Sequence, residues 1–264
     1  MRKYLQLFKN YQAESWEYRA NIVGGIVSEL IGIISALIFW LAIYKSNTQI
    51  AGYTLNKVIF YYLLMPLIGS ITSVWISNKV GSEIKSGFFT NYLIKPNKPI
   101  LNILTHTFAY KFNYLATTVP VYLIFLIGFS FFSTIRFSGI NILMGLLTAI
   151  SGFFIHCLMD LAISWLGFWV DDVWSFQHFK NFIFAIFGGV AFPFDFLPSS
   201  MRLIFELLPF KFFYYIPASY INNQRSFSYL FSDILSLCLW GTLFYLIGIK
   251  LYSAGIKKYA AFGY

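Results

Sequence analysis

Charged side chains are scarce in this sequence. Asp, Glu, Lys and Arg make up 11% of its 264 residues, whereas an ordinary soluble domain carries about 25%. Hydrophobic residues make up 58% and aromatic residues 22%, so too little polar surface is available to cover a soluble fold of this length. The composition therefore predicts one integral membrane domain that spans residues 1–264.

Cysteine is almost absent, and so are the motifs of several catalytic sites. Cys157 and Cys238, the two cysteines, lie in apolar runs, so no disulfide framework is indicated. The sequence contains no G-x-x-x-x-G-K-[ST] phosphate loop, no G-x-S-x-G elbow and no H-E-x-x-H zinc motif. These absences disfavour a membrane-embedded enzyme and predict a chain with no catalytic residues and no nucleotide, metal or cofactor site of its own.

Long apolar runs are what the sequence has in their place. A helix needs about 20 mostly apolar residues to cross the hydrocarbon of a bilayer. Besides five longer apolar runs, the sequence has a sixth, residues 182–194. This run has thirteen residues and would reach only about 20 Å as a helix. The pattern predicts an all-α membrane fold with six transmembrane helices, the fifth of them stunted. The five predicted full spans are residues 20–44, 58–78, 114–132, 139–159 and 234–249.

The region after the stunted run, residues 191–226, is rich in both proline and apolar side chains. Backbone groups that proline leaves unpaired cannot face lipid, so broken helices persist only where protein or a water-filled cavity covers them. We therefore expect the fifth span to be broken or re-entrant at the outer side, with a short helix near residues 201–208. Two ordinary helices joined by an outer loop remain the alternative.

Lys and Arg are distributed unequally between the two sides of the predicted spans. If the N-terminus is cytoplasmic, the inner segments hold about twice as many of them as the outer segments, and such an excess marks the cytoplasmic side. The sequence therefore predicts a multi-pass cell-membrane protein with both termini in the cytoplasm. The net charge of +9 is then a topology signal and an attraction to anionic lipid, with no sign of nucleic-acid binding.

Two polar segments on the predicted cytoplasmic side have helical periodicity. In residues 1–19, Tyr4, Leu7, Phe8 and Tyr11 share one face, which is typical of an amphipathic helix that lies in the membrane interface. The second segment, residues 79–100, separates the second and third spans.

This second segment has a predicted turn, an apolar face and a predicted end. Gly87 can end one helical turn because glycine adopts the left-handed cap conformation. Phe88, Phe89 and Leu93 then recur on one face, with Tyr92, and prolines at positions 96 and 99 end the element. The pattern fits either a short element that docks on another protein or a solvated loop that touches lipid headgroups.

Glu29 and His156 fall inside the predicted spans, and Asp160 directly follows the fourth. Glu29 lies about nine residues into the first span, where a charge is costly unless it faces protein or water. It could line a transport route, or it could pair with a hydroxyl or with Lys111 across spans, although Lys111 can also extend to the inner surface. His156 and Asp160 are spaced to meet on one helix face, as a proton relay, as part of a metal site or as a structural pair, with Asp160 near hydration at the cytoplasmic end.

Four features, in this order along the chain, resemble the permeases of ABC type-2 exporters. They are the amphipathic N-terminal helix, the cytoplasmic segment EIKSGFFTNYLIKP, the proline-broken region with FPFDFLP and LPFKFFYYIPASY, and the C-terminal GIKLYSAGIKKYAAFGY. The resemblance covers essentially the whole chain. It looks closest to the subgroup in which the permease and the ATPase are separate polypeptides.

The resemblance implies that residues 79–100 form a cytoplasmic coupling element, which docks in a groove of the ATPase with the N-terminal helix beside it. Two copies of an ATP-binding-cassette subunit would bind the ATP and Mg, so this chain would be a transport subunit and not itself an enzyme. A second permease copy or a homologue would complete the exporter. The implied ATPase-coupling residues are Glu83, Ile84, Ser86, Gly87, Phe88, Phe89, Leu93 and Pro96.

The resemblance also implies a route for cargo between the two permease copies, lined by the first, second and fifth spans. An aromatic, mostly apolar lining suits export of a hydrophobic or amphipathic cargo: a drug-like molecule, a lipid-linked compound or a peptide. The candidate lining residues are Ile26, Glu29, Ile33, Tyr62, Met65, Ser70, Phe184 and Phe187.

Two other functions stay open at this point. An ion-coupled secondary transporter would use Glu29 or the pair His156 and Asp160. A non-transporting membrane scaffold would need none of these residues.

Overall fold

The computed structural model describes residues 2–17, 19–46, 48–94, 98–133 and 138–259, and its long elements are all helices. Five helical segments are long and apolar enough to cross a membrane, and each overlaps one of the five predicted full spans. Their helices are α2 (Arg19–Ile43), α3 (Leu55–Thr72), α6 (Pro99–Phe132), α7 (Gly139–Ser164) and α11 (Leu230–Lys258).

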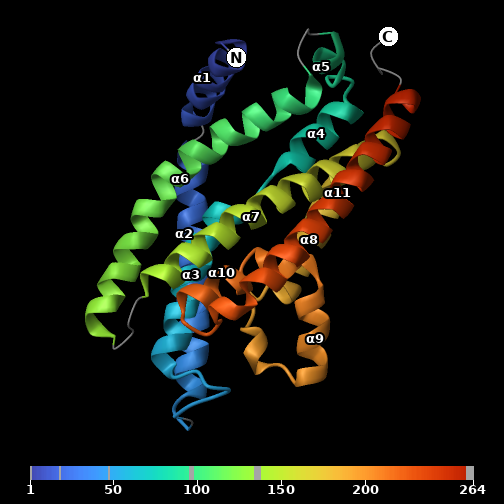
Figure 1. The fold of residues 1–264 in the computed structure, drawn as a ribbon. Coiled ribbons are helices and arrows are strands. Elements are labelled where there is room, and N and C mark those ends of the chain that lie inside the picture. The colour runs from blue at the N-terminus through green and yellow to red at the C-terminus, as the bar shows by residue number, and fades with distance from the viewer. Residues whose placement is uncertain (1, 18, 47, 95–97, 134–137, 260–264) are drawn as a thin grey trace.

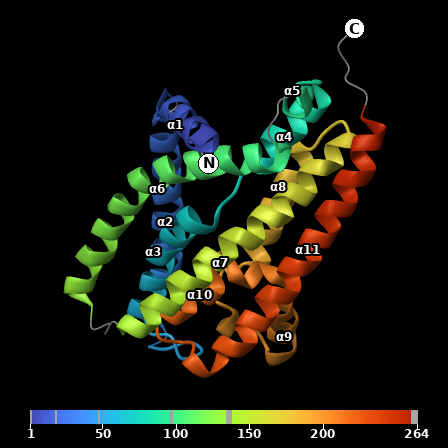
Figure 2. The same ribbon diagram turned by 45° about the horizontal axis from the view of Figure 1, so that its top comes forward.

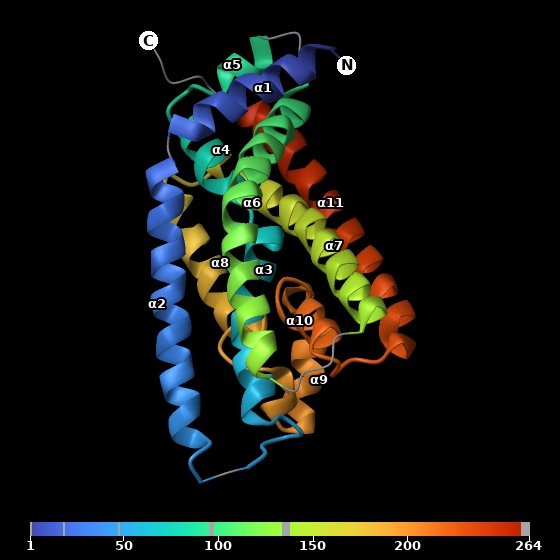
Figure 3. The ribbon, with the colours of Figure 1, turned by 90° about the vertical axis from the view of Figure 1, so that its left-hand side faces the viewer.

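The long helices run between two ends of the molecule. The N-terminal helix α1 (Arg2–Glu17) and the two short helices α4 (Ile76–Lys85) and α5 (Thr90–Ile94) lie at one end, where α11 also ends (Figure 1). Helix α9 (Ser199–Leu207) lies at the opposite end (Figure 2). Helix α1 crosses over the top of the bundle, and α2 stands at its edge (Figure 3).

The core lies around α3, whose side chains are largely enclosed. Val58, Phe60 and Tyr61 on this helix pack with Tyr122 of α6 in one buried cluster. Helices α2 and α11, in contrast, leave most of their apolar side chains exposed. Apolar helices of this length are stable with such faces only where lipid or another protein covers them.

The predicted second span is shorter than expected, because α3 ends at Thr72. Ser73 has an extended backbone with φ −64° and ψ 144°, and α4 begins only at Ile76. The last carbonyls of a helix need partners from outside the helix, and the Lys111 ammonium donates to the carbonyl of Ser70 at 2.7 Å. Prediction of one continuous helix over 58–78 was therefore wrong.

The third span starts earlier than its apolar run. Helix α6 begins at Pro99 and has 34 residues. Proline favours the first position of a helix, where its missing N–H would have no partner in any case. Pro99 therefore begins α6. In the sequence analysis, this proline was instead assigned to the end of the preceding element.

The predicted stunted run, residues 182–194, overlaps the helix α8 (Trp174–Phe187), which begins eight residues earlier than the run and ends seven residues earlier. The chain turns at Gly188 and Gly189, and Gly189 has φ +87°. A Cβ at Gly189 would lie 2.8 Å from the Cβ of Tyr215 and 2.9 Å from the hydroxyl of Tyr61. Only glycine fits this close approach without strain.

After this turn the chain is broken into short helices. They are η2 (Phe194–Phe196), α9 near the expected position, η3 (Pro209–Phe212) and α10 (Tyr215–Ile221). All seven residues of α10 are buried, and the N–H of Tyr215 donates to the carbonyl of Gly188 at 2.9 Å. The part of the broken region that forms α10 is thus covered by protein, as the physical argument requires, whereas no residue of α9 is buried.

Candidate functional site

The turn between α4 and α5 is built on Gly87, as the sequence predicts. Gly87 has φ +80°, a conformation that favours glycine. The N–H of Phe89 donates across the turn to the carbonyl of Glu83 at 2.9 Å, and that of Thr90 donates to the carbonyl of Gly87 at 3.1 Å. Two successive bonds fix the direction in which α5 leaves α4.

Phe89 anchors this turn inside the protein. Its side chain is 0% exposed and is surrounded by the rings of Tyr92, Trp165, Phe168 and Tyr259, whose centroids lie 5.6–5.9 Å away. Trp165 and Phe168 belong to the 3-10 helix η1 (Trp165–Phe168) that extends α7. The turn is therefore attached to the bundle by an aromatic cluster.

Phe88 points the other way and is 65% exposed, while Leu93 is 39% exposed. The predicted single face with Phe88, Phe89 and Leu93 was wrong, because adjacent residues in this tight turn project to opposite sides. Phe88, Leu93 and the exposed Ser86 form an outer surface, which we call the α4–α5 knob. Phe89 supports the knob from within.

The other predicted coupling residues have structural contacts. Ile84 is buried at 3% exposure, and the Ser86 hydroxyl donates to the carbonyl of Ser82 at 2.8 Å. Burial raises the pKa of Glu83, which Lys79 and a hydrogen bond from Tyr92 oppose. Pro96 lies outside the described residues.

Tyr259, next to the C-terminus, fixes the knob from the far end of the sequence. Its hydroxyl donates to the carbonyl of Gly87 at 3.0 Å and lies 3.2 Å from the hydroxyl of Thr90. Helix α11 approaches closely here, because a Cβ at Gly255 would lie 2.1 Å from the ring of Phe168. Sequence reasoning noted the C-terminal motif but missed this contact, since it joins residues 172 positions apart.

Helix α1 is confirmed as a helix, and its predicted apolar face packs on α6. Phe8 meets Phe112 edge to face, and the Tyr11 hydroxyl donates to the Asn102 side chain at 3.0 Å. Further along, the Asn113 amide donates to the carbonyl of Gln12 at 2.9 Å. Helix α1 is therefore attached to the first half of α6 as well as being amphipathic.

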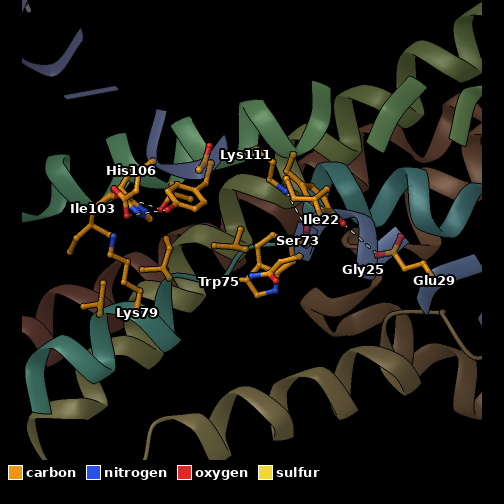
Figure 4. A pocket seen from close by; sticks show the side chains of 18 of the residues that line it. Ile22, Gly25, Glu29, Ser73, Trp75, Lys79, Ile103, His106 and Lys111 are labelled. Atoms are coloured by element: carbon orange, nitrogen blue, oxygen red, sulfur yellow. Dashed lines mark hydrogen bonds between the residues drawn. The ribbon is translucent and has the colours of Figure 1, made fainter. Parts of the chain in front are cut away.

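A cavity of about 660 Å³ lies beneath α1, between α2, the start of α4 and α6. Figure 4 shows Lys79 and His106 at one end, Lys111 with Ser73 and Trp75 in the middle, and Glu29 at the other end. Its volume is within the usual range for small-molecule sites.

Glu29 lines this cavity but does not contact Lys111. Its carboxylate accepts a hydrogen bond from Tyr122 and lies 3.5 Å from the hydroxyl of Tyr114. Of the two partners considered from sequence, the structure shows the hydroxyl. Lys111 is 8% exposed and bonds to the end of α3, so it does not extend to the inner surface as expected.

His156 and Asp160 meet a third residue, Lys180 of α8, in a fully enclosed network. The Lys180 ammonium lies 2.6 Å from Asp160 Oδ1 and 3.2 Å from His156 Nε2. Asp160 also accepts the N–H and the hydroxyl of Ser77 at 3.0 Å each, and His156 Nδ1 lies 2.8 Å from the carbonyl of Thr72. Asp160 is 0% exposed, so the expectation that it is hydrated was wrong.

This network joins the base of the knob to the bundle. Ser77 lies in the first turn of α4, Asp160 on α7 and Lys180 on α8. Sequence reasoning missed Lys180. The presence of His156 and Asp160 on one face was the available signal, but it could not identify a partner on another helix.

The predicted cargo-path residues are mostly packed inside this chain. Tyr62, Met65, Ser70 and Phe184 are buried, while Ile26 packs partly exposed against α3. Ile33 and Phe187 are half-buried. The structure brings only Glu29 of this group into the described cavity, so the assignment of a path to these residues stays a prediction.

Ion pairs at the opposite end stabilise the region between α8 and α11. Arg225 pairs with Asp233 at 2.6 Å, with both side chains buried, and Arg202 pairs with Asp195 at 2.9 Å. The Tyr53 hydroxyl donates to Asp195 at 2.7 Å. These contacts join the loop before α3 to the broken helices, which fits a rigid region.

Comparison with known families gives one assignment. A family model described as "ABC-2 family transporter protein" matches residues 30–263. No curated protein and no solved structure gives a significant match to the chain.

Proposed function

Because the chain belongs to the ABC-2 transporter family, we propose that it is the membrane subunit of an ATP-driven exporter. The family match over 30–263 carries this proposal, and the five apolar helices support the role of a multi-pass membrane subunit. Two separate ATPase subunits supply the energy, with ATP and Mg bound in them. The chain is a transport subunit without an ATPase site.

The α4–α5 knob is the surface on which we propose that the ATPase docks. It has the two properties that transmission of a movement needs: an exposed apolar contact at Phe88 and a buried anchor at Phe89. The anchor connects to α7 through Trp165, and the base of the knob connects to α8 through the Asp160 network. A push on Phe88 is thus transmitted to two helices of the bundle.

We propose that cargo passes between this chain and a second permease copy or homologue. The exposed apolar face of α2, which includes Val27, Ile31 and Ile38 at 51–63% exposure, supports this arrangement because it lacks a partner within the described chain. An apolar interface suits a hydrophobic or amphipathic cargo, such as a drug-like molecule, a lipid-linked compound or a peptide.

The proposed topology has six crossings, with α8 and the broken helices after it forming the fifth as a re-entrant unit at the outer side. Helix α1, the end of α11 and the knob lie at one end of the molecule (Figure 1), and we place this end, with both termini, in the cytoplasm from the excess of Lys and Arg. The ion-coupled alternative has less support, because Asp160, His156 and Lys180 are buried and already bonded to one another or to α3 and α4.

Cysteine labelling tests this topology. In a variant with Cys157→Ser and Cys238→Ala, a cysteine at exposed Ser86 is expected to react with a membrane-impermeant maleimide only when the cytoplasmic side is accessible. A cysteine at exposed Ser228 is expected to react only from outside. The reverse pattern would contradict the orientation, and reaction of both from one side would contradict an odd number of crossings between them.

Purification from native membranes in mild detergent tests the proposed function itself. A subunit that hydrolyses ATP is expected to co-purify with the chain, and the complex is expected to move cargo into inverted vesicles only with ATP and Mg. Uptake that needs an ion gradient and no ATP would instead support a secondary transporter. A complex with neither activity would support the scaffold.

A further inference from the structure

Two lysines and two glutamates line the cavity beneath α1, and both carboxylates already have hydrogen-bond donors. Glu14 accepts from the Tyr110 hydroxyl at 3.1 Å, and Glu29 accepts from Tyr122. Lys79 and Lys111 line the same cavity, and within the described ranges neither of them forms an ion pair. Glu83 and Glu14 lie close enough to Lys79 to interact with it electrostatically, so Lys111 is the cation of this cavity without an acidic partner among the described residues.

Lys111 is the central group of this cavity. Its ammonium is enclosed and donates to two neutral oxygens, the carbonyl of Ser70 at 2.7 Å and the hydroxyl of Ser73 at 3.2 Å. The rings of Trp75, Tyr114 and Phe153 lie 5.3–5.7 Å from it. An ammonium has three donors, so one N–H is left for another acceptor, and a buried cation without an anion is costly.

A second donor group points to the same kind of ligand. His106 lines the cavity one and a half helical turns from Lys111 on α6, and its Nε2 is buried with no hydrogen-bond partner in the part of the chain that the structure describes. Buried polar atoms are usually bonded. His106 lies at the Lys79 end of the cavity (Figure 4), so it could bond to another polar group of a ligand whose anionic oxygens lie at Lys111.

We propose that this cavity binds a phosphate group, held by Lys111, with the rest of the ligand lying along the cavity. A lipid headgroup and inorganic phosphate share this chemistry, and the walls favour the lipid. They include the apolar side chains of Ile22, Val74 and Ile103. On the α2 wall, a Cβ at Gly25 would meet nothing within 4 Å, so there is room for an acyl chain between α2 and α6.

This site is separate from the α4–α5 knob and from a route between two permease copies. The proposal rests on the proposed function only for the position of α1 at the membrane surface, where a lipid would enter. Ligand binding to the purified chain requires no ATPase, so failure of the binding experiment and failure of the exporter assignment are distinguishable.

Binding of lysophosphatidic acid, a phosphate monoester with one acyl chain, to the purified full chain tests the proposal. Lys111→Met is expected to weaken binding about tenfold or more, because a charge-assisted hydrogen bond is lost. Lys111→Arg, which keeps the charge, is expected to bind more tightly than Lys111→Met. Gly25→Trp, which fills the α2 wall without changing a charge, is expected to weaken binding to a similar extent.

Two controls identify the source of the phosphate and exclude surface attraction. Lys9→Met removes an exposed lysine of α1 and is expected to leave the affinity unchanged. A monoacylglycerol with the same chain is expected not to compete. Competition by inorganic phosphate at the same concentration as the lipid would identify free phosphate as the ligand, whereas much weaker competition would identify a lipid.

Equal affinity in the wild type and Lys111→Met, with both proteins eluting as folded monodisperse species, would overturn the proposal. Equal competition by the uncharged monoacylglycerol would also overturn it, because the apolar walls alone would then account for binding. If Lys111→Met does not fold, the comparison of Gly25→Trp with Lys9→Met decides: equal affinities in these two variants would reject the cavity as the site.

Discussion

Replacement of Phe88 by Ser is expected to abolish co-purification of the ATPase subunit while the chain still inserts and folds. The side chain is 65% exposed, so its removal creates no cavity inside the chain. Truncation of a central apolar residue in an interface commonly costs about 2 kcal/mol or more, which weakens binding about 30-fold. The measurement is the amount of ATPase subunit retained on the tagged chain.

Two further variants distinguish loss of the contact with the ATPase from loss of the internal support of the knob. Leu101→Ser removes another exposed apolar side chain, in the first turn of α6, and is expected to retain the ATPase. Phe89→Ser is expected to destabilise the chain itself by about 3–5 kcal/mol, as for loss of a buried aromatic ring. If Phe88→Ser retained the ATPase in full, the knob would not be the docking surface.

The second large effect is expected at the buried pair of Lys180 and Asp160. Lys180→Met leaves the Asp160 carboxylate enclosed with only the Ser77 donors, and removal of one partner of a buried pair costs about 3–5 kcal/mol. The measurement is the free energy of unfolding, or the midpoint of thermal unfolding, of the purified chain in detergent.

A double variant tests whether the loss comes from the unpaired charge. Asp160→Asn combined with Lys180→Met removes both charges and keeps a side-chain oxygen for the N–H of Ser77, so it is expected to recover much of the lost stability. If the double variant were as unstable as the sum of the single ones, the two residues would act independently. If Lys180→Met were as stable as the wild type, the pair would not stabilise the fold.

The position of the same network, between α4 and α8, also predicts an effect on transport. Ser77 connects α4 to Asp160, and Lys180 connects Asp160 to α8. A folded variant with a weakened pair is therefore expected to keep the ATPase bound but to move less cargo for each ATP hydrolysed. This result would distinguish the role of the contacts between α4, α7 and α8 from the role of the docking contact at Phe88.

Much of the fold could be predicted because lipid exposure leaves long apolar runs in the sequence. Helices α2 and α7 begin within one residue of the predicted positions, and Gly87 forms the expected turn. The ends of helices were harder to predict where a single residue determines them. The end of α3 depends on Lys111, which is 41 positions away, and the start of α6 depends on Pro99 and not on hydropathy.

The site was predicted less completely, because its contacts join distant segments. Local spacing identified Phe88 and Phe89 as apolar but could not show that one is exposed and the other buried. That difference comes from Trp165, Phe168 and Tyr259, which lie far away in the sequence. The partners of Asp160 and of Glu29 are likewise on other helices, so spacing on one helix cannot identify them.

Cross-linking from position 88 tests the central claim most directly. A photoreactive amino acid in place of Phe88, in cells that assemble the native complex, is expected to cross-link to a polypeptide that binds and hydrolyses ATP. The same group at Leu101 is expected to give far less of this product. Products that contain only lipid or a second copy of this chain, with no ATP-hydrolysing polypeptide, would contradict a membrane subunit that is moved by a separate ATPase through the α4–α5 knob.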